Sequence, residues 1–265
     1  MRDIRDCDLS NEQRLNFFAS SPLCALSWTF SGQGILLQNH HQPDNLKDAF
    51  AFPKIAFSGP YQTPQVSRSE GSFYAMTLAF YPDAFAALTG IDLARFTNKT
   101  IAAEDVLPDE FFEIAQTTSL QNEATHTFDC FTSEISPFWQ RSRPAGTNVE
   151  HLVSDWFRAL AVRAAFTGVG RSTRQIERRV KYWTGHSRQR LAAYAKGEKT
   201  FQYALAKSAA GQLNLADMSA DLGYADQSHM GRKAKEITGF SPAEFMHRYE
   251  NDESFWSFRL MGERF

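Results

Sequence analysis

The first half of the chain carries apolar side chains at the spacing of β-strands. In FYAMTLAF, residues 73–80, a large side chain occupies every second position, which is typical of a half-buried strand. CALSWTF at 24–30 and KIAFSG at 54–59 predict two further strands. Pro82 suits the first turn of a helix that Gly90 ends. The pattern therefore predicts a mixed α+β fold.

From residue 149 onward the apolar positions follow helical spacing. One helical face is formed by Val149, Leu152, Val153, Trp156, Phe157, Leu160 and Ala164. Between the halves, QRSRPAGTNVE at 140–150 interrupts both patterns, so we place a domain boundary there. We expect an α+β amino-terminal domain over 1–145, an all-α domain over 149–250 and an aromatic carboxy-terminal tail over 251–265.

An internal repeat is the most informative feature of the second half. STRQIERRVKYWTGHS at 172–187 aligns with DQSHMGRKAKEITGFS at 226–241, at an offset of 54 residues. An apolar i, i+4, i+7 stripe is shared, with Ile176, Val180 and Trp183 in one copy and Met230, Ala234 and Ile237 in the other. Chance can produce such a stripe in two amphipathic helices. It does not easily produce the shared polar positions, which are Arg178 and Arg232, Lys181 and Lys235, Thr184 and Thr238, Gly185 and Gly239, and Ser187 and Ser241.

Each copy follows another helix and a tight break. Ser172 and Asp226 stand where helix amino-terminal caps are expected, and Ser172 with Gln175 forms a capping box. Before the second copy, Asn214 can cap a helix that Gly223 ends. The sequence therefore predicts two helix-turn-helix motifs.

Charge is divided unevenly between the halves, although the formal net charge is only −2. Residues 1–149 carry 10 Lys/Arg and 17 Asp/Glu, whereas residues 150–250 carry 16 and 10. The stretch 171–190 alone holds seven basic residues and one acidic residue, Glu177. A basic half suits nucleic acid as a partner, but a charge run by itself is also typical of a solvated face.

In a helix-turn-helix the second helix enters the major groove, and its outward side chains meet base edges. Arg can bind guanine and Gln adenine through paired hydrogen bonds, each worth ~1–3 kcal/mol of discrimination. The predicted base-reading residues are Arg174, Gln175, Arg178, Gln227, Ser228, His229 and Arg232. The residues predicted to reach phosphates, which position the protein without reading sequence, are Arg179, Lys181, Asn214, Lys233 and Lys235. The alternative is that these side chains only solvate a helical bundle.

The segment from about Val149 to Tyr249 resembles the DNA-binding domain of AraC/XylS-type transcription regulators. TGHS at 184–187 and LADMSADLGYADQSHMGRKAKEITGFSP at 215–242 carry the resemblance. It implies two helix-turn-helix motifs joined by a long helix, here over 188–211. The two recognition helices then occupy successive major-groove segments on one face of DNA, about 34 Å apart.

The chain departs from the family pattern at Gly197, inside the joining helix, and at Met230, where the family often has Phe. The tail resembles the end of a subset of relatives, and we expect its aromatic residues, Phe255, Trp256 and Phe258, to pack back on a domain. The stretch 82–107 loosely resembles the amino-terminal domain of some of these regulators, which senses a small molecule, pairs subunits, or does both. The resemblance implies double-stranded DNA as a partner. It leaves a small-molecule effector, RNA polymerase and a homodimer open.

No catalytic or metal-binding set emerges from the sequence. The three cysteines, Cys7, Cys24 and Cys130, form neither a disulfide framework nor the cysteine cluster of a DNA-repair methyl acceptor. His40 and His41 have no third ligand at a suitable spacing. GQG at 32–34 is too short for a phosphate loop and is expected to make a hairpin turn. Aromatic residues of the first half could line an apolar ligand pocket, but core packing is the preferred interpretation for Trp28, Phe30, Phe52, Phe57, Tyr61, Phe73 and Tyr74.

We therefore expect a transcription regulator without enzyme activity, cofactor or metal, whose first domain controls DNA binding. The segment MRDIRDCDLS is charged where a signal peptide would be apolar, and no run approaches the roughly 18 apolar residues of a membrane span. A cytoplasmic protein is expected. The competing hypothesis is a small-molecule-binding protein or enzyme in which the helical half serves as a protein-interaction module.

Overall fold

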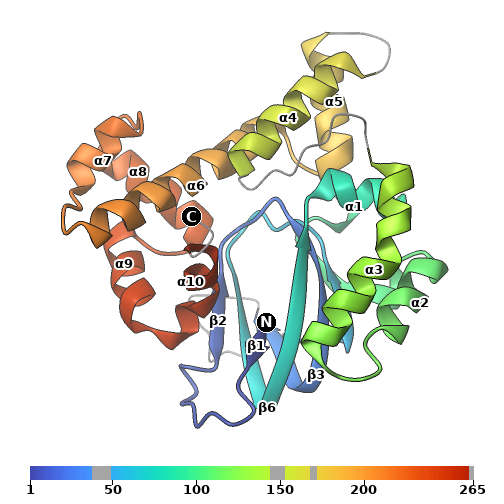
Figure 1. Cartoon of the computed structure of the whole chain (residues 1–265). Coiled ribbons are helices and arrows are strands. Elements are labelled where there is room, and N and C mark those ends of the chain that lie inside the picture. The colour runs from blue at the N-terminus through green and yellow to red at the C-terminus, as the bar shows by residue number, and fades with distance from the viewer. Residues whose placement is uncertain (38–48, 144–152, 168–171, 263–265) are drawn as a thin grey trace.

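The computed structural model describes residues 1–37, 49–143, 153–167 and 172–262. An antiparallel sheet with three helices forms the first half, and helices form the second (Figure 1). This is the expected α+β domain followed by an all-α domain. The expected boundary between 145 and 149 falls outside the described residues.

The strands are β1 (Arg2–Asp3), β2 (Leu15–Phe18), β3 (Cys24–Leu37), β4 (Phe50–Ala51), β5 (Ile55–Ser58), β6 (Gln65–Phe80) and β7 (Thr100–Ala102). The α-helices are α1 (Pro82–Thr89), α2 (Asp109–Thr117), α3 (Ala124–Ser142), α4 (Val153–Phe166), α5 (Thr173–Thr184), α6 (Arg188–Ala209), α7 (Leu215–Asp221), α8 (Gln227–Thr238), α9 (Pro242–Asn251) and α10 (Trp256–Gly262). Short 3-10 turns are η1 (Leu93–Phe96), η2 (Ala103–Asp105) and η3 (Glu253–Phe255). The predicted strands 24–30, 54–59 and 73–80 lie within or around β3, β5 and β6.

Two long strands hold the sheet together. β3 pairs with β6 from Cys24 opposite Phe80 to Leu37 opposite Val66, within the strand order β1-β6-β3-β5-β7. β2 pairs with β6, and β4 with β3. All of these pairings are antiparallel.

The hairpin turn expected at residues 32–34 is wrong, because β3 runs on through this stretch with a break in its register. Gly32 supplies the bend with a φ of +71°. A Cβ at this position would lie 2.6 Å from the backbone oxygen of Glu70, so glycine is required by both conformation and space. β3 is therefore bulged around Gly32, and its pairing with β6 continues on both sides of the bulge.

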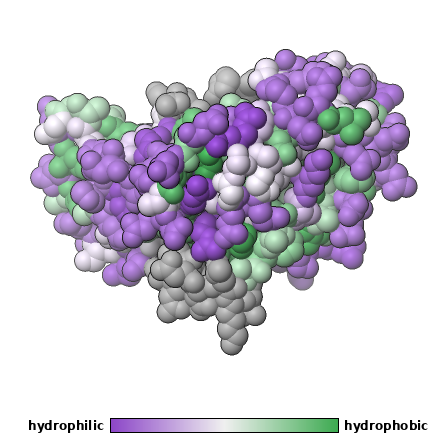
Figure 2. All heavy atoms as spheres, turned by 90° about the horizontal axis from the view of Figure 1, so that it is seen from below, coloured by the Kyte–Doolittle hydropathy of each residue, from purple (hydrophilic) through white to green (hydrophobic). Residues whose placement is uncertain are grey.

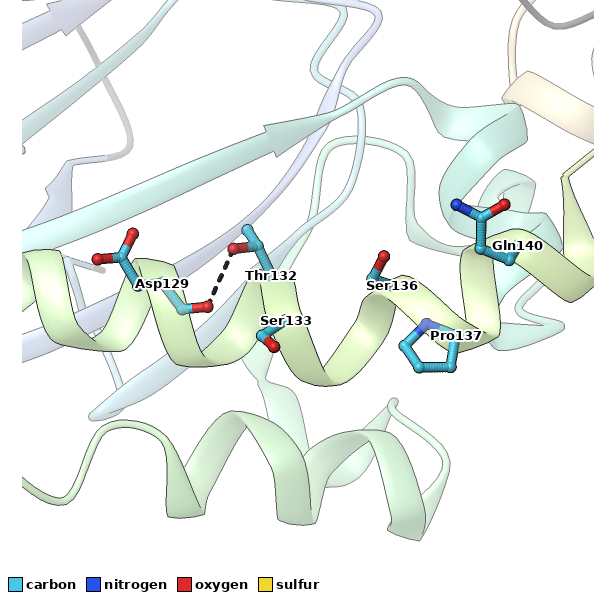
Figure 3. A pocket seen from close by; sticks show the side chains of 6 residues that line it. All are labelled: Asp129, Thr132, Ser133, Ser136, Pro137 and Gln140. Atoms are coloured by element: carbon cyan, nitrogen blue, oxygen red, sulfur yellow. Dashed lines mark hydrogen bonds between the residues drawn. The ribbon is translucent and has the colours of Figure 1, made fainter.

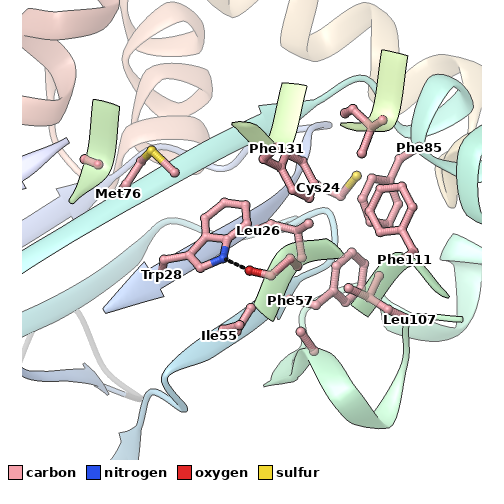
Figure 4. Packing of buried hydrophobic residues seen from close by; sticks show 14 of the residues in the cluster. Cys24, Leu26, Trp28, Ile55, Phe57, Met76, Phe85, Leu107, Phe111 and Phe131 are labelled. Atoms are coloured by element: carbon pink, nitrogen blue, oxygen red, sulfur yellow. Dashed lines mark hydrogen bonds between the residues drawn. The ribbon is translucent and has the colours of Figure 1, made fainter. Parts of the chain in front are cut away.

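Helices α1, α2 and α3 lie beside the sheet, and aromatic side chains fill the space between them (Figures 1 and 4). Trp28, Phe57, Phe85 and Phe131 are at most 1% exposed. The Phe57 and Phe85 rings stack with centroids 5.3 Å apart, and the Trp28 indole N–H donates to the carbonyl of Ala115 at 2.9 Å. Core packing was the preferred interpretation of Trp28 and Phe57, and it is confirmed.

The helical half contacts the sheet domain first through α1 and α4. The Tyr81 and Trp156 rings stack with centroids 5.0 Å apart. Asp83 is 8% exposed, and its carboxylate accepts from Trp156 Nε1 at 2.8 Å and from the Arg163 guanidinium. A buried carboxylate is costly unless its oxygens are paired, so these two donors fix α4 against α1.

A second contact joins the end of the chain to β2. Phe255 and Phe258 are 0% and 2% exposed and share one apolar cluster with Leu15 and Phe17 of β2. Trp256 Nε1 donates to Asn16 Oδ1 at 2.8 Å, and α10 lies beside β2 in Figure 1. The tail therefore packs back as expected, and it does so against the amino-terminal domain and the last helices at once.

One face of the molecule can be followed in a space-filling view. On the face seen in Figure 2, hydrophilic side chains predominate and hydrophobic ones form small groups between them. Across the described ranges, no helix combines the length and the apolarity needed to cross a lipid bilayer.

Phe258→Ala tests the shared cluster. Truncating a fully buried phenylalanine removes its contacts and leaves a cavity, so we expect the free energy of unfolding to fall by about 3–5 kcal/mol. Chemical denaturation followed by tryptophan fluorescence measures this, with Leu260→Ala as the matched control because Leu260 is 43% exposed on the same helix. Equal losses in the two variants would contradict the packing described here.

Candidate nucleic-acid interface

Two pairs of helices form the candidate interface: α4 with α5, the first helix-turn-helix, and α7 with α8, the second. The predicted capping box starts α5, because Ser172 Oγ accepts from the Gln175 N–H at 3.4 Å and Gln175 Oε1 accepts from the Ser172 N–H at 3.3 Å. Asp226 starts α8 by accepting the His229 N–H at 2.6 Å. Asn214 caps α7 as predicted, accepting from the Ala216 N–H at 2.9 Å.

The shared Thr-Gly-x-Ser sequence ends the second helix of each pair. Thr184 and Thr238 each donate Oγ1–H to the carbonyl four residues earlier, at 2.7 and 2.9 Å. Each also accepts the N–H two residues later, at 3.1 and 3.2 Å. Gly185 and Gly239 take left-handed φ values of 74° and 89°, and the serine that follows caps the next helix in both copies. The most specific part of the repeat is therefore explained by helix termination.

The apolar stripe of the repeat points inward in both copies. Val180 in the first copy and Met230 in the second are both 0% exposed, and their repeat counterparts, Ala234 and Ile176, are half-buried. The opposite stripe faces solvent and is largely polar. On α5 it consists of Arg174, Glu177, Arg178, Lys181 and Tyr182, and on α8 of Gln227, Ser228, Arg232, Lys235 and Glu236. Arg178 and Arg232 occupy the same repeat position, as do Lys181 and Lys235.

Several residues that were predicted to contact DNA already make hydrogen bonds, ion pairs or ring contacts within the protein. Gln175 Oε1 belongs to the capping box, and Asn214 Oδ1 belongs to the cap of α7. Arg179 is half-buried, and its Nη1 donates to the Ala164 carbonyl at 2.9 Å. Lys233 pairs with Glu236 at 2.8 Å. His229 is also half-buried, with its ring edge-on to Tyr224 at 5.7 Å.

Sequence reasoning missed one exposed side chain on the first stripe. Tyr182 is 63% exposed and lies four residues after Arg178 on α5. An aromatic ring with a hydroxyl at this position is able to contact both a sugar and a phosphate. The i, i+4 spacing from Arg178 was the available signal.

The joining helix α6 runs unbroken through Gly197. A Cβ at Gly197 would lie 2.4 Å from Ile237 Cδ1, so the glycine lets α8 approach α6 closely. Its departure from the family pattern thus has a packing reason. With 22 residues, α6 is about 33 Å long at about 1.5 Å per residue. The first helix-turn-helix packs near the start of α6 through Leu191, and the second near its end through Ala204.

Both second helices are held at their carboxy-terminal ends by the sheet domain. The Ser20 N–H, just after β2, donates to the Ile237 carbonyl in the last turn of α8 at 2.7 Å. At the end of α5, Gly185 lies against the backbone of Leu93 and Ala94 in and around η1. The amino-terminal turns of α5 and α8, which carry Arg174, Gln227 and Ser228, lie at the opposite ends of these helices from the contacts.

His186 lies where α5, α6 and the sheet domain meet. It is 1% exposed, and its ring is edge-on to Tyr194 with centroids 5.5 Å apart. Neither ring nitrogen has a hydrogen-bond partner within the described part of the chain. Burial, followed by the nearby Arg190 charge, lowers the pKa of His186 to about 4. The equivalent residue of the second copy is Phe240, also buried, so an apolar ring suits this position.

A shallow hollow lies on the outer side of α3 (Figure 3). Its lining comes from one helix and consists of Asp129, Thr132, Ser133, Ser136, Pro137 and Gln140. Thr132 Oγ1 already donates to the Asp129 carbonyl at 3.2 Å.

For the ranges described, no group of three or more His, Cys, Asp or Glu residues is placed to hold a metal ion. His40 and His41, which were considered as ligands from the sequence, lie outside these ranges.

No protein-family model matches the chain, and no curated protein matches it. Among solved structures, it is similar to ToxT from Vibrio cholerae, an AraC-family regulator. An apo form of a ToxT variant from strain SCE256 has 13% identity and a TM-score of 0.38, over 88% of this chain and 93% of that one. ToxT from O395 has 12% identity and a TM-score of 0.36, over 88% and 94%. An unsaturated fatty acid bound form from SCE256 has 12% identity and a TM-score of 0.34, over the same shares.

His186 gives a pH dependence with a definite sign. Its folded-state pKa of about 4 lies below the ordinary value of 6.5, so the unfolded chain binds a proton that the folded chain refuses. Folding stability is therefore unaffected above pH 6.5 and falls as the pH drops from 6.5 toward 4. We expect His186→Phe to recover about 2 kcal/mol of unfolding free energy at pH 5, relative to its effect at pH 7.5.

Urea denaturation at the two pH values measures this difference. His247→Phe is the control, because His247 is exposed on α9. A pH effect that His186→Phe and His247→Phe change equally would show that His186 is not the group responsible.

Proposed function

We propose that this protein is a sequence-specific transcription regulator of the AraC/XylS type. Its recognition helices would be α5 and α8, which enter two successive major-groove segments. The observation that carries the proposal is the repeat at an offset of 54 residues, which folds into two helices with matching ends and matching exposed Arg and Lys positions. Both motifs pack against α6, the first at Leu191 and the second at Ala204, so one helix carries both recognition helices.

Within this proposal the side chains differ in role. Arg178 and Arg232 are the primary base readers, because both are exposed and lie on the solvent stripe at the same repeat position. Arg174, Gln227 and Ser228 lie in the first turns of their helices, where base edges are reached first. Lys181 and Lys235 lie further along and reach phosphates. Gln175, His229, Asn214, Arg179 and Lys233 act first through the internal contacts described above and support the readers in position.

We also propose that the sheet domain controls DNA binding by holding both recognition helices. It contacts the end of α8 through Ser20 and the end of α5 through η1. A small molecule or a second copy of the chain that shifts these contacts would change how the two helices are placed relative to each other. Such a regulator acts in the cytoplasm, where it meets DNA.

The test of the proposed function is selection of bound duplexes from a random library, followed by sequencing. We expect a bipartite motif with centres about 10 base pairs apart, because each recognition helix reads one turn of DNA. Recovery of a single short motif would contradict two reading helices. No preference for DNA, together with turnover of a metabolite, would instead favour the competing enzyme or ligand-binding hypothesis.

Arg178→Ala and Arg232→Ala should relax the selected motif at different bases. Each loses the paired hydrogen bonds to one base, worth ~1–3 kcal/mol of discrimination, so the preference should disappear in one half of the motif only. Repeating the selection with each variant measures this. The control is Arg158→Ala, because Arg158 is exposed on α4 outside the recognition helices and should leave the motif intact. Loss of preference across both halves in either variant would contradict the assignment.

A further inference from the structure

The two helix-turn-helix motifs carry very different charge. The first, counted over α4 and α5, has six basic and two acidic residues, a formal charge of +4. The second, counted over α7 and α8, has three basic and three acidic residues, a formal charge of zero. The repeat therefore preserves the helix ends and the central Arg and Lys but not the electrostatic character of the two motifs.

The exposed stripes show a smaller inequality, because Arg163 pairs with Asp83 and Arg179 donates to the Ala164 carbonyl. With the exposed Glu177 and Glu236 included, the stripe of α5 carries a formal charge of +2 and that of α8 a formal charge of +1. Arg174, Arg178 and Lys181 are all exposed on α5, and no ion pair is found for them within the described ranges. At the position of Arg174 the second copy has Ser228. The second copy keeps only the counterparts of the other two, Arg232 and Lys235.

Acidic groups also surround the start and the outer face of α8. Asp226 caps α8 where the first copy uses the neutral Ser172, so a negative charge stands at the end of the helix that approaches DNA. Glu236 is exposed on the stripe and pairs with Lys233 at 2.8 Å, which removes that lysine as a free cation. Two further carboxylates, Asp217 and Asp221, lie exposed on α7. Asp226, Asp217 and Asp221 repel phosphate, and the Lys233–Glu236 pair adds no net attraction.

We propose that the two motifs divide the work of DNA binding. The first supplies most of the sequence-independent attraction to the phosphate backbone. The carboxylates of the second motif repel the phosphates of DNA of arbitrary sequence. This motif binds only where hydrogen bonds to its cognate bases outweigh that repulsion. This inference rests on the proposed function and names which half of the interface anchors and which half discriminates.

The chemistry of phosphate binding gives the inference a measurable form. Each phosphate that a cation neutralises releases a condensed counterion, so the logarithm of the affinity falls with the logarithm of salt by about 0.9 per contact. The change in the salt slope when the cations of one motif are removed therefore reports how many phosphates that motif contacts. Because the repeat matches the two stripes residue by residue, equivalent substitutions compare them directly.

The experiment measures binding of the full chain to a mixed-sequence 30-base-pair duplex by fluorescence anisotropy over a KCl series. On the mixed-sequence duplex, which lacks the cognate bases, the exposed Arg178 contacts phosphate as Lys181 does. We expect the double variant Arg178→Ala and Lys181→Ala to lose more than about fivefold in affinity at low salt and to lower the salt slope by about 2. The variant Arg232→Ala and Lys235→Ala should lose less than about threefold and lower the slope by less than about 1. A loss per removed charge in the second motif equal to that in the first would overturn the inference.

A gain of binding provides the complementary test. Asp226→Asn with Glu236→Gln removes two negative charges while an amide still caps α8. We expect several-fold tighter binding to the mixed-sequence duplex and a steeper salt slope. Asp129→Asn with Glu134→Gln, on α3, is the matched control and should change neither. Unchanged affinity in the α8 variant would overturn the inference.

The fates of the two proposals can be told apart. If the wild-type chain binds the mixed-sequence duplex and selects a bipartite motif, equal effects of the matched variants would overturn only the division of work. If the wild-type chain binds neither the mixed-sequence duplex nor any duplex from the random library, the proposed function itself fails and this inference fails with it. Unchanged thermal unfolding midpoints in all variants establish that the substitutions act on binding.

Discussion

The shared aromatic cluster between β2 and the last helices determines how the rest of the molecule is arranged. Phe17 contributes a ring from the sheet, and Phe255 and Phe258 contribute rings from the last helices. The ring centroids of Phe17 and Phe255 are 5.6 Å apart. The Arg248 guanidinium lies over the rings of Phe17 and Phe255 and forms an ion pair with Asp252. Apolar area removed from water by this cluster stabilises both halves of the chain at once, at about 25 cal/mol per Å². The sheet domain and the second helix-turn-helix are therefore parts of one cooperative structure.

The placement of α5 and α8 follows from that arrangement. α6 sets the distance between the two motifs, and the sheet domain holds the end of each second helix, through η1 for α5 and through Ser20 for α8. The Asp83 carboxylate, buried between Trp156 and Arg163, adds directional hydrogen bonds to a contact that apolar packing alone would leave less specific. Each of the two helices is therefore held by α6 and by the sheet domain.

Local signals in the sequence predicted a large part of this structure. Ser172, Asp226 and Asn214 cap the helices as expected, and the 54-residue repeat predicted the second helix of each pair, because capping and amphipathic spacing depend on neighbours in the chain. Features that depend on contacts between distant parts of the chain were not predicted. The bulge at Gly32 depends on the close approach of β6, and the commitment of Arg179 to the Ala164 carbonyl depends on how α4 crosses α5. Tail packing was expected, but its target, β2, depends on a partner about 240 residues away. Arg174, Arg178, Lys181, Arg232 and Lys235 are exposed as expected. Arg179 and Lys233 are half-buried and already have partners, which the sequence alone did not indicate.

That sequence separation has a consequence for how the protein is made. During synthesis, β2 is made 240 residues ahead of Trp256 and Ser257, which hydrogen-bond to Asn16 and Phe17. Domains generally fold during synthesis from the amino-terminal end, but the aromatic side chains of β2 stay uncovered until α10 emerges. A nascent chain in which α10 has not yet been made therefore exposes the apolar side chains of β2 to chaperones and proteases. Only once α10 is available can the sheet domain and the second helix-turn-helix bury their shared cluster.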